Sequence, residues 1–334
     1  MMKTIGLILG TLLLVCMTGW GSLALFIDGS GSENTRMGFA IVYAVLGVIS
    51  VLAFAFSKRR WLAAITLTGM FVILLGWWIS LAPSNDRDWQ PDVAVLPYAT
   101  FDEDQVTIHN VRNFDYRTET DFTVRYDDRT YDLRELDSMD LVAVYWMGPM
   151  IAHVFLSFGF GDEHLAISIE ARKERTEGYS TFKGFFKQYE LFYVVADERD
   201  VIRLRTNYRN DPPEDVYIFR ANVPQENIKR LFLEYVRQIN QLREQPQFYN
   251  TLTTNCTTTI LMHSHVNPDH LPFSWKVLVS GYVPEYVYDT GRLDTSLPFS
   301  ELFQQSHINT RAHAADQAPD FSRLIRSALP PAAS

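Results

Sequence analysis

The sequence predicts an α+β domain tethered to a membrane by three amino-terminal transmembrane helices. Three apolar stretches, at residues 5–27, 37–56 and 62–82, each reach the roughly 20 residues that a helix needs to cross a bilayer core. The chain then changes to short strand-like runs followed by one long amphipathic pattern, which is typical of an antiparallel sheet with packed helices. The expected domains are a transmembrane region at 1–82, a globular domain at 83–310 and a poorly ordered tail at 311–334.

Charges in the short loops predict how the three helices are oriented. Lys3 precedes the first helix and three bases at 58–60 separate the second from the third, whereas the loop 28–36 holds two acids and one base. Because basic residues favour the cytoplasmic side, we expect a cytoplasmic amino terminus and an exported domain after about residue 83. The first stretch is too long for a cleaved signal peptide and is followed by two more spans.

The exported part of the chain is acidic. Five basic and two acidic residues precede position 83, which leaves 25 of the 30 basic and 37 of the 39 acidic residues after it. Such an excess of negative charge disfavours a nucleic-acid partner and any broad attraction to anionic lipid.

The exported domain shows a series of strand signals before its long helix. The clearest is a hairpin, with arms at 152–160 and 164–172 that are rich in branched and aromatic residues. Further strands are expected at 191–196, 201–206 and 215–220, and the amphipathic helix at 224–244.

Cys256 is the one cysteine outside the apolar stretches, since Cys16 lies within the first. The polar segment 249–262 is typical of a loop that enters a helix, with Thr254 or Asn255 as the cap and Cys256 in the first turn. There the helix dipole and the unpaired N–H groups favour a thiolate and can hold an oxyanion. These features indicate a nucleophile, and the alternative is a small buried apolar residue.

A cysteine nucleophile needs a base, and His153 stands out among the eight histidines because it lies in an apolar strand after a Gly148-Pro149 turn. Folding the hairpin about Asp162 brings residues 170–172 opposite His153, so Glu170 is the candidate that orients the ring. The alternatives are a core histidine with satisfied hydrogen bonds and an ordinary solvated glutamate.

Three histidines after Cys256, His263, His265 and His270, raise the question of a metal site with Asp269. His-x-His on a helix points its two rings about 200° apart, and no third ligand has diagnostic spacing. We therefore expect no metal and no cofactor.

A cluster of charged residues follows the hairpin and could meet a phosphate or carboxylate head group. An internal salt-bridge network is the preferred interpretation. The cluster comprises Arg172, Glu198, Arg199, Asp200, Arg203 and Arg205.

Four segments of the domain together resemble a known family. They are His-Val-Phe-Leu-Ser-Phe-Gly-Phe at 153–160, Ile-Glu-Ala-Arg-Lys-Glu at 169–174, Asp-Glu-Arg-Asp at 197–200 and Tyr-Asn-Thr-Leu-Thr-Thr-Asn-Cys-Thr-Thr at 249–258. They resemble the Lnb-type lipoprotein N-acyltransferase family, whose periplasmic domain is related to circularly permuted NlpC/P60-like, papain-like thiol enzymes. In the permuted enzymes the histidine strand precedes the cysteine helix, which is the order seen here.

The resemblance implies a multi-pass protein of the bacterial inner membrane with a periplasmic catalytic domain. By position, Cys256 corresponds to the nucleophile and His153 to the base. The implied reaction moves a fatty-acyl chain from a phospholipid or diacylglyceryl donor, through a Cys256 thioester, to the amino-terminal amine of a lipoprotein. The alternatives are an NlpC/P60-like amidase or peptidase acting on cell-wall peptides and a non-enzymatic membrane-anchored binding protein.

Two further sets of residues are candidates for substrate contact. Those for the substrate or the oxyanion are Tyr249, Asn255, Thr257, Arg172 and Arg203. Those that could line an acyl groove, or else belong to the core, are Trp146, Phe182, Phe185, Phe186 and Trp275.

Overall fold

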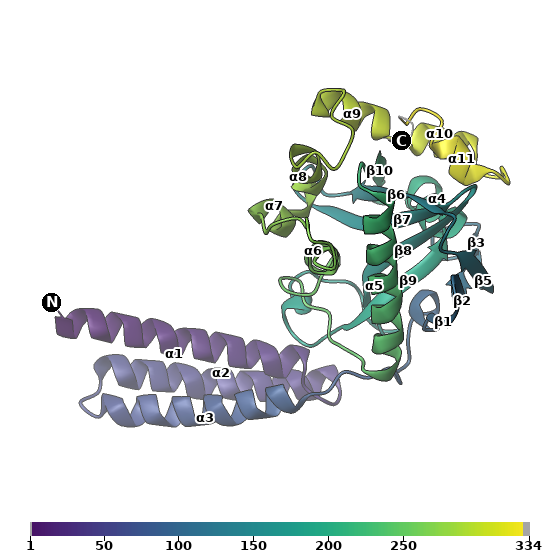
Figure 1. The fold of residues 1–334 in the computed structure, drawn as a ribbon. Coiled ribbons are helices and arrows are strands. Elements are labelled where there is room, and N and C mark those ends of the chain that lie inside the picture. The colour runs from purple at the N-terminus through teal and green to yellow at the C-terminus, as the bar shows by residue number, and fades with distance from the viewer. Residues whose placement is uncertain (1, 330–334) are drawn as a thin grey trace. The chain divides into compact units, whose positions relative to one another are not determined.

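The structure is a computed structural model that describes residues 2–329, and it divides into two compact units (Figure 1). One unit holds the chain up to Ser84 together with Tyr179–Tyr189. The other holds Asn85–Gly178 and the chain from Glu190 onward.

The first unit contains the three expected apolar helices, α1 (Met2–Ile27), α2 (Glu33–Phe56) and α3 (Arg60–Ser80), each long and apolar enough to cross a membrane. Small residues let α1 and α2 approach closely, as is usual where helices pack in lipid. A Cβ atom on Gly21 would collide with the ring of Tyr43, and one on Gly47 would collide with Thr18.

The second unit is built on a mixed sheet, which confirms the α+β class. Its strand order is β1-β2-β9-β8-β7-β6-β10, with β5 also paired to β2. Within residues 2–329, only the β2–β9 contact of this sheet is parallel. The strands are β1 (Tyr98–Asp102), β2 (Gln105–Arg112), β5 (Tyr126–Asp132), β6 (Leu136–Tyr145), β7 (Ala152–Phe160), β8 (Glu163–Arg172), β9 (Glu190–Asp197) and β10 (Asp215–Arg220). A separate short pair is formed by β3 (Asp115–Tyr116) and β4 (Phe122–Thr123).

The predicted hairpin is confirmed as β7 and β8. Its ladder runs from Phe160 paired with Glu163 to Leu156 paired with Ile167 and stops there. Continuing that register by three residues places Glu170 across from His153. The two side chains therefore lie on the same face of the sheet.

Helices cover both faces of the sheet because successive strand residues point to opposite sides. One face is covered by α5 (Gln225–Glu244), the expected amphipathic helix (Figure 1). Its Phe232 ring packs against Phe158 and Phe160. On the other face Phe155 joins a core with buried residues of α4 (Glu198–Arg203), α10 (Asn309–Ala314) and α11 (Phe321–Ile325). The remaining helices are η1 (Pro91–Val93), η2 (Lys183–Phe185), α6 (Cys256–Ser264), α7 (Trp275–Leu278), η4 (Ser280–Tyr282), α8 (Val283–Asp289) and α9 (Phe299–Ser306).

Two sequence-based expectations are wrong. The expected strand at 201–206 is helical, because the Asp197 side chain caps α4 by accepting from the N–H of Arg199, and α4 continues into a π-helical turn, η3 (Leu204–Tyr208). The tail expected to be poorly ordered from 311 is folded as far as residue 329. Its residues Phe321 and Ile325 are fully buried, and Arg326 forms ion pairs with Asp140 and Glu198.

Candidate active site

Cys256 is the first residue of α6 and has a free, partly exposed thiol. A capping box fixes this helix start: Oδ1 of Asn255 accepts from the N–H of Thr258 at 2.9 Å, and Oγ1 of Thr258 accepts from the N–H of Asn255 at 3.0 Å. Nδ2 of Asn255 also donates to the carbonyl of Thr251 at 2.6 Å. Of the two expected caps, Asn255 is therefore the one used, and Cys256 lies where the helix dipole favours a thiolate.

His153 lies near the start of β7, and the surrounding loops hold this end of the strand. Gly148 adopts a φ of 79°, which favours glycine, in the turn before the strand. The N–H of Ala152 donates to Oγ of Ser280 at 3.0 Å, and the N–H of Gly281 donates to the carbonyl of Met150 at 3.0 Å. A Cβ on Gly281 would collide with the carbonyl of Pro149, so this close approach requires glycine.

Sulfur and imidazole meet where the β7–β8 ladder has ended. His153 hydrogen-bonds to the Cys256 sulfur, and the N–H of Val154 donates to the same sulfur. Because the ladder stops at Leu156, the Val154 N–H is left for the thiol rather than for β8. The end of the ladder thus makes room for the start of α6.

The other side of the His153 ring faces Glu170 and Ser168. Nε2 of His153 lies 3.0 Å from Oε1 of Glu170 and 2.7 Å from Oγ of Ser168, and that serine hydroxyl donates to Oε1 of Glu170 at 2.7 Å. Since Nε2 is engaged in this way, Nδ1 is the ring nitrogen left to face Cys256. The structure thus brings together Cys256, His153 and Glu170, the three residues singled out for catalysis.

Arg205 is a further partner of Glu170. Its Nη2 donates to Oε1 of Glu170 at 3.1 Å and its Nη1 donates to Oε2 of Glu214 at 3.4 Å, while Arg209 binds the same Glu214 at 3.1 Å. Arg205 is buried, so the pairing with Glu170 is shielded from solvent. Neither Ser168 nor Arg205 was expected to contact the catalytic candidates.

The electrostatics of the cluster favour a thiolate beside an imidazolium. Burial opposes charge on His153, but the neighbouring Glu170 carboxylate outweighs it and raises the pKa of His153 to about 9. Burial alone would raise the pKa of Cys256, yet the hydrogen bond and the charge of His153, together with the Val154 N–H, lower it below the usual thiol value. For Glu170 the pKa lies well below the usual carboxyl value, because His153 and Arg205 more than offset its burial.

The other substrate candidates are engaged inside the protein. Arg172 is buried between the rings of Trp89 and Phe192 and donates to the carbonyls of Val93 and Ala94. Arg203, also buried, donates to Asp115 at 2.9 Å. The charged cluster is accordingly an internal network, as preferred from the sequence.

Tyr249 and Thr257, two further candidates, are both buried. Oγ1 of Thr257 donates to the carbonyl of Val277 at 2.7 Å, so this side chain joins α6 to α7. The aromatic candidates divide between the two units. Trp146 and Trp275 belong to the sheet unit, whereas the three phenylalanines lie within Tyr179–Tyr189 in the helical unit.

The histidines after Cys256 do not gather into a metal site. Across residues 2–329 no group of three or more histidine, cysteine, aspartate or glutamate side chains could hold a metal ion. His263 is buried and hydrogen-bonds to the hydroxyl of Tyr193, while His265 stacks near His270 with ring centroids 4.2 Å apart.

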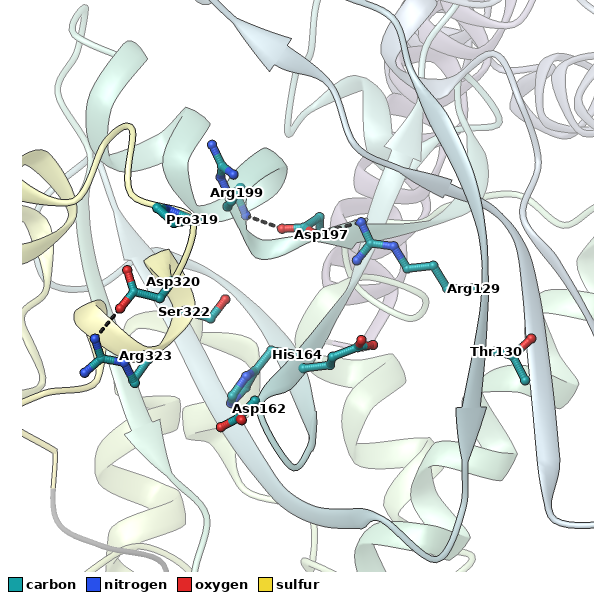
Figure 2. Close-up of a pocket in the computed structure, with 11 residues that line it drawn as sticks. Arg129, Thr130, Asp162, His164, Asp197, Arg199, Pro319, Asp320, Ser322 and Arg323 are labelled. Carbon is teal, nitrogen blue, oxygen red and sulfur yellow. Dashed lines mark hydrogen bonds and ion pairs between the residues drawn. The ribbon is translucent and has the colours of Figure 1, made fainter.

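The hollows of the sheet unit include two of similar size. Figure 2 shows one of about 650 Å³ at the β7–β8 turn, where Asp197 pairs with Arg129 at 2.8 Å and Asp320 pairs with Arg323. Asp162 in this hollow follows His153 by nine positions along the extended arm of the hairpin, which corresponds to about 30 Å. The other, of about 700 Å³, includes Tyr145 and Trp146, and Tyr145 is paired with Ala152, next to His153.

The fold and the site define a class: a membrane-anchored α+β protein whose sheet unit brings a cysteine at the start of a helix against a histidine and a carboxylate. Residues 122–281 match the family model of the Lnb N-terminal periplasmic domain, and the matched segment includes both Cys256 and His153. The sheet unit is therefore similar to the Lnb periplasmic domain, and the three amino-terminal helices support a membrane anchor. No curated protein and no solved structure matches the chain.

Proposed function

We propose that the protein is a thiol acyltransferase that N-acylates bacterial lipoproteins at the outer face of the inner membrane. The observation that carries the proposal is the contact of Cys256 with His153, which Glu170 backs, in a domain similar to the Lnb periplasmic domain. An imidazolium beside a thiolate is the usual arrangement of an activated cysteine nucleophile.

In the first half-reaction the Cys256 thiolate attacks the ester carbonyl carbon of a phospholipid or a diacylglyceryl group. The ester C–O bond breaks, His153 gives its proton to the departing glycerol oxygen, and the acyl chain remains as a thioester on sulfur. In the second half-reaction the α-amine of the lipid-modified cysteine of a lipoprotein attacks the thioester. The C–S bond breaks, the amine proton passes to His153, and the thiolate is restored.

The start of α6 offers donors for the oxyanion that forms in both steps. The first intrahelical bond runs from the N–H of Thr259 to the carbonyl of Asn255. The N–H groups of Cys256 and Thr257 precede it, and backbone donors in this position stabilise a developing negative charge beside the nucleophile. Asn255 acts here as the cap that fixes the direction of these two N–H groups.

The membrane tether and the aromatic hollow support a lipid substrate. With a cytoplasmic amino terminus, as the loop charges predict, α3 leads out to the periplasm, where donor and acceptor both lie in the same leaflet. The hollow that includes Tyr145, the strand partner of Ala152, has Trp146 and Tyr282 in its lining, and the ring centroids of Trp275 and Tyr282 lie 5.5 Å apart. We assign the acyl chain to this hollow.

The direct test is to incubate the purified full-length protein with phospholipid and to analyse it by intact-protein and peptide mass spectrometry. An acyl adduct on the Cys256 peptide that disappears on adding a diacylated lipoprotein peptide, with N-acylated peptide as product, is the expected result. Cys256→Ser and His153→Ala should form no thioester, and Cys16→Ser, the matched control, should behave like the unaltered chain.

Two outcomes would contradict the proposal. Absence of an adduct together with cleavage of peptidoglycan fragments would identify a hydrolase that uses the same residues. Failure of a thiol-reactive probe to label Cys256 at neutral pH in the folded protein would leave the non-enzymatic binding protein.

A further inference from the structure

The segment Tyr179–Tyr189 joins two strands of the sheet unit, β8 and β9, yet it packs as part of the helical unit. Lys187 fixes it there. Its Nζ donates to the carbonyls of Trp78, Ile79 and Leu81 at 2.8, 3.2 and 2.9 Å, which are carbonyls at the carboxyl end of α3. Its backbone N–H donates to Oδ1 of Asp28, just after the end of α1, at 3.1 Å.

The same segment also contacts α1 through an aromatic side chain, Phe186. Phe186 is buried and stacks on Trp20 of α1 with ring centroids 6.3 Å apart, and Trp20 in turn contacts Phe71 and Trp78 of α3. Trp20 precedes Ile27, the last residue of α1, by seven residues. At 1.5 Å a residue, Phe186 therefore lies about 10 Å below the end of the helix.

The neighbours of Phe186 are large, apolar and exposed. Phe182 is 53% exposed and Phe185 is 46% exposed. Beside them, the outer surfaces of α1 and α3 present many exposed apolar side chains, because these helices are composed to face lipid. The exposed phenylalanines thus extend a surface that is already apolar, at the depth where aromatic side chains gather in membrane proteins.

We propose that the loop Tyr179–Tyr189 is inserted into the outer leaflet, with Phe182 and Phe185 in contact with the acyl chains of bilayer lipid. Lys183, between the two rings in the sequence, suits the boundary with the phosphate groups, since lysine reaches such a boundary with its flexible stem. Lipid is the occupant because the surface continues that of the transmembrane helices. The loop would then be a second attachment of the sheet unit to the bilayer, in addition to the chain that leaves α3.

The test measures the depth of a spin label at position 182 in the full-length chain, reconstituted in vesicles of phosphatidylethanolamine and phosphatidylglycerol. The label is attached to Phe182→Cys in a background of Cys16→Ser and Cys256→Ser. The depth is obtained from how often the label collides with two reagents, oxygen, which concentrates in the bilayer, and a nickel chelate, which stays in water. Thr120→Cys, in the exposed connection between β3 and β4, is the matched aqueous control.

We expect collisions with the nickel chelate to be about fivefold rarer at position 182 than at position 120, and collisions with oxygen to be more frequent, since the bilayer core excludes water and polar solutes. Equal collision rates at the two positions would overturn the proposal. So would protection from both reagents, which would mean that protein rather than lipid covers the ring. If Phe182→Cys loses its helical circular dichroism, Phe185→Cys is measured in the same way and decides the question. No step requires catalysis, so the outcome is separate from that of the proposed acyl transfer.

Discussion

Nε2 of His153 lies 3.0 Å from Oε1 of Glu170, across two strands whose hydrogen-bonded ladder has already ended. The separation of β7 and β8 at this point lets the amino end of α6 approach the ring from the other side. One histidine therefore contacts both a carboxylate and a thiol. The consequences for ionisation can be measured without knowing the substrate.

Alkylation of Cys256 should report the thiolate directly. Because His153 lowers the pKa of Cys256, iodoacetamide should react well below pH 8.5, the ordinary thiol pKa. His153→Ala removes the hydrogen bond and the charge that lower the pKa of Cys256, while burial still raises it. The pH at which the alkylation rate is half-maximal should therefore move upward by one unit or more. A midpoint that does not move would show that the helix start alone activates the sulfur.

Glu170→Gln tests the carboxylate behind the histidine. Glu170 is the main influence that raises the pKa of His153 to about 9, whereas burial lowers it. In the variant the alkaline limit of activity should therefore shift from about pH 9 toward the acid side. We expect kcat/KM at neutral pH to fall roughly 10²-fold, the lower end of what acid–base groups contribute. Glu163→Gln, on the exposed end of β8, should leave both quantities unchanged.

Arg205 should act through Glu170 and not on the substrate. Arg205→Ala removes a charge that opposes protonation of His153, but it also frees the carboxylate that holds the ring. We expect kcat to fall about tenfold with little change in KM, because an interaction that matters in the transition state is weakened while substrate binding is not. Arg205→Lys should recover part of kcat. A fall confined to KM would instead place Arg205 at the substrate.

The sequence was sufficient for the parts of the site that local patterns determine. Alternation of apolar residues on either side of Asp162 defines the hairpin, and its fold places Glu170 opposite His153. Polar residues around Cys256 define a helix start. Ser168 could have been found as well, since it lies two residues before Glu170 and therefore on the same face of β8.

The remainder depends on contacts that are distant in the sequence. Arg205 reaches Glu170 only because α4 and its π-helical turn replace the strand suggested by Val201 and Ile202. Asp200 forms an ion pair with Arg112 at 2.7 Å, and these two residues are 88 positions apart in the sequence. No local pattern identifies such partners.

Asn255→Ala should separate the helix start from the nucleophile itself. The variant loses the acceptor for the Thr258 N–H, which typically lowers the free energy of unfolding by about 1 kcal/mol. Because the same cap fixes the first turn of α6, the alkylation rate of Cys256 should also fall. Ser274→Ala removes the comparable cap of α7 and should lower the melting temperature without slowing alkylation. Equal alkylation rates in the two variants would contradict a role for Asn255 in aiming the thiol.

The carboxyl-terminal tail should be necessary for the stability of the sheet unit, because it supplies Arg326. This side chain lies 2.7 Å from Asp140 and also pairs with Glu198, and both carboxylates are buried. Arg326→Met leaves the buried Glu198 carboxylate without its arginine, whereas Asp140 keeps its ion pair with Arg220 at 2.5 Å. The unpaired Glu198 should destabilise the unit by about 3–5 kcal/mol at pH 7. Arg323→Met, on the same helix, removes only an exposed pair and should cost less than about 1 kcal/mol.

The pH dependence of the stability lost in Arg326→Met follows from the ionisation of Glu198. Burial alone would raise the pKa of Glu198, but Arg326 lowers it to about 2 in the unaltered chain. The stability that this lowered pKa contributes is present above the ordinary carboxyl pKa of about 4.3 and is lost only as the pH falls toward 2. In Arg326→Met the pKa should instead rise, so that the folded state binds a proton more tightly than the unfolded chain. The difference in melting temperature between the two proteins should therefore be smaller at pH 5 than at pH 7, and a difference that grows at pH 5 would exclude Glu198 as its source.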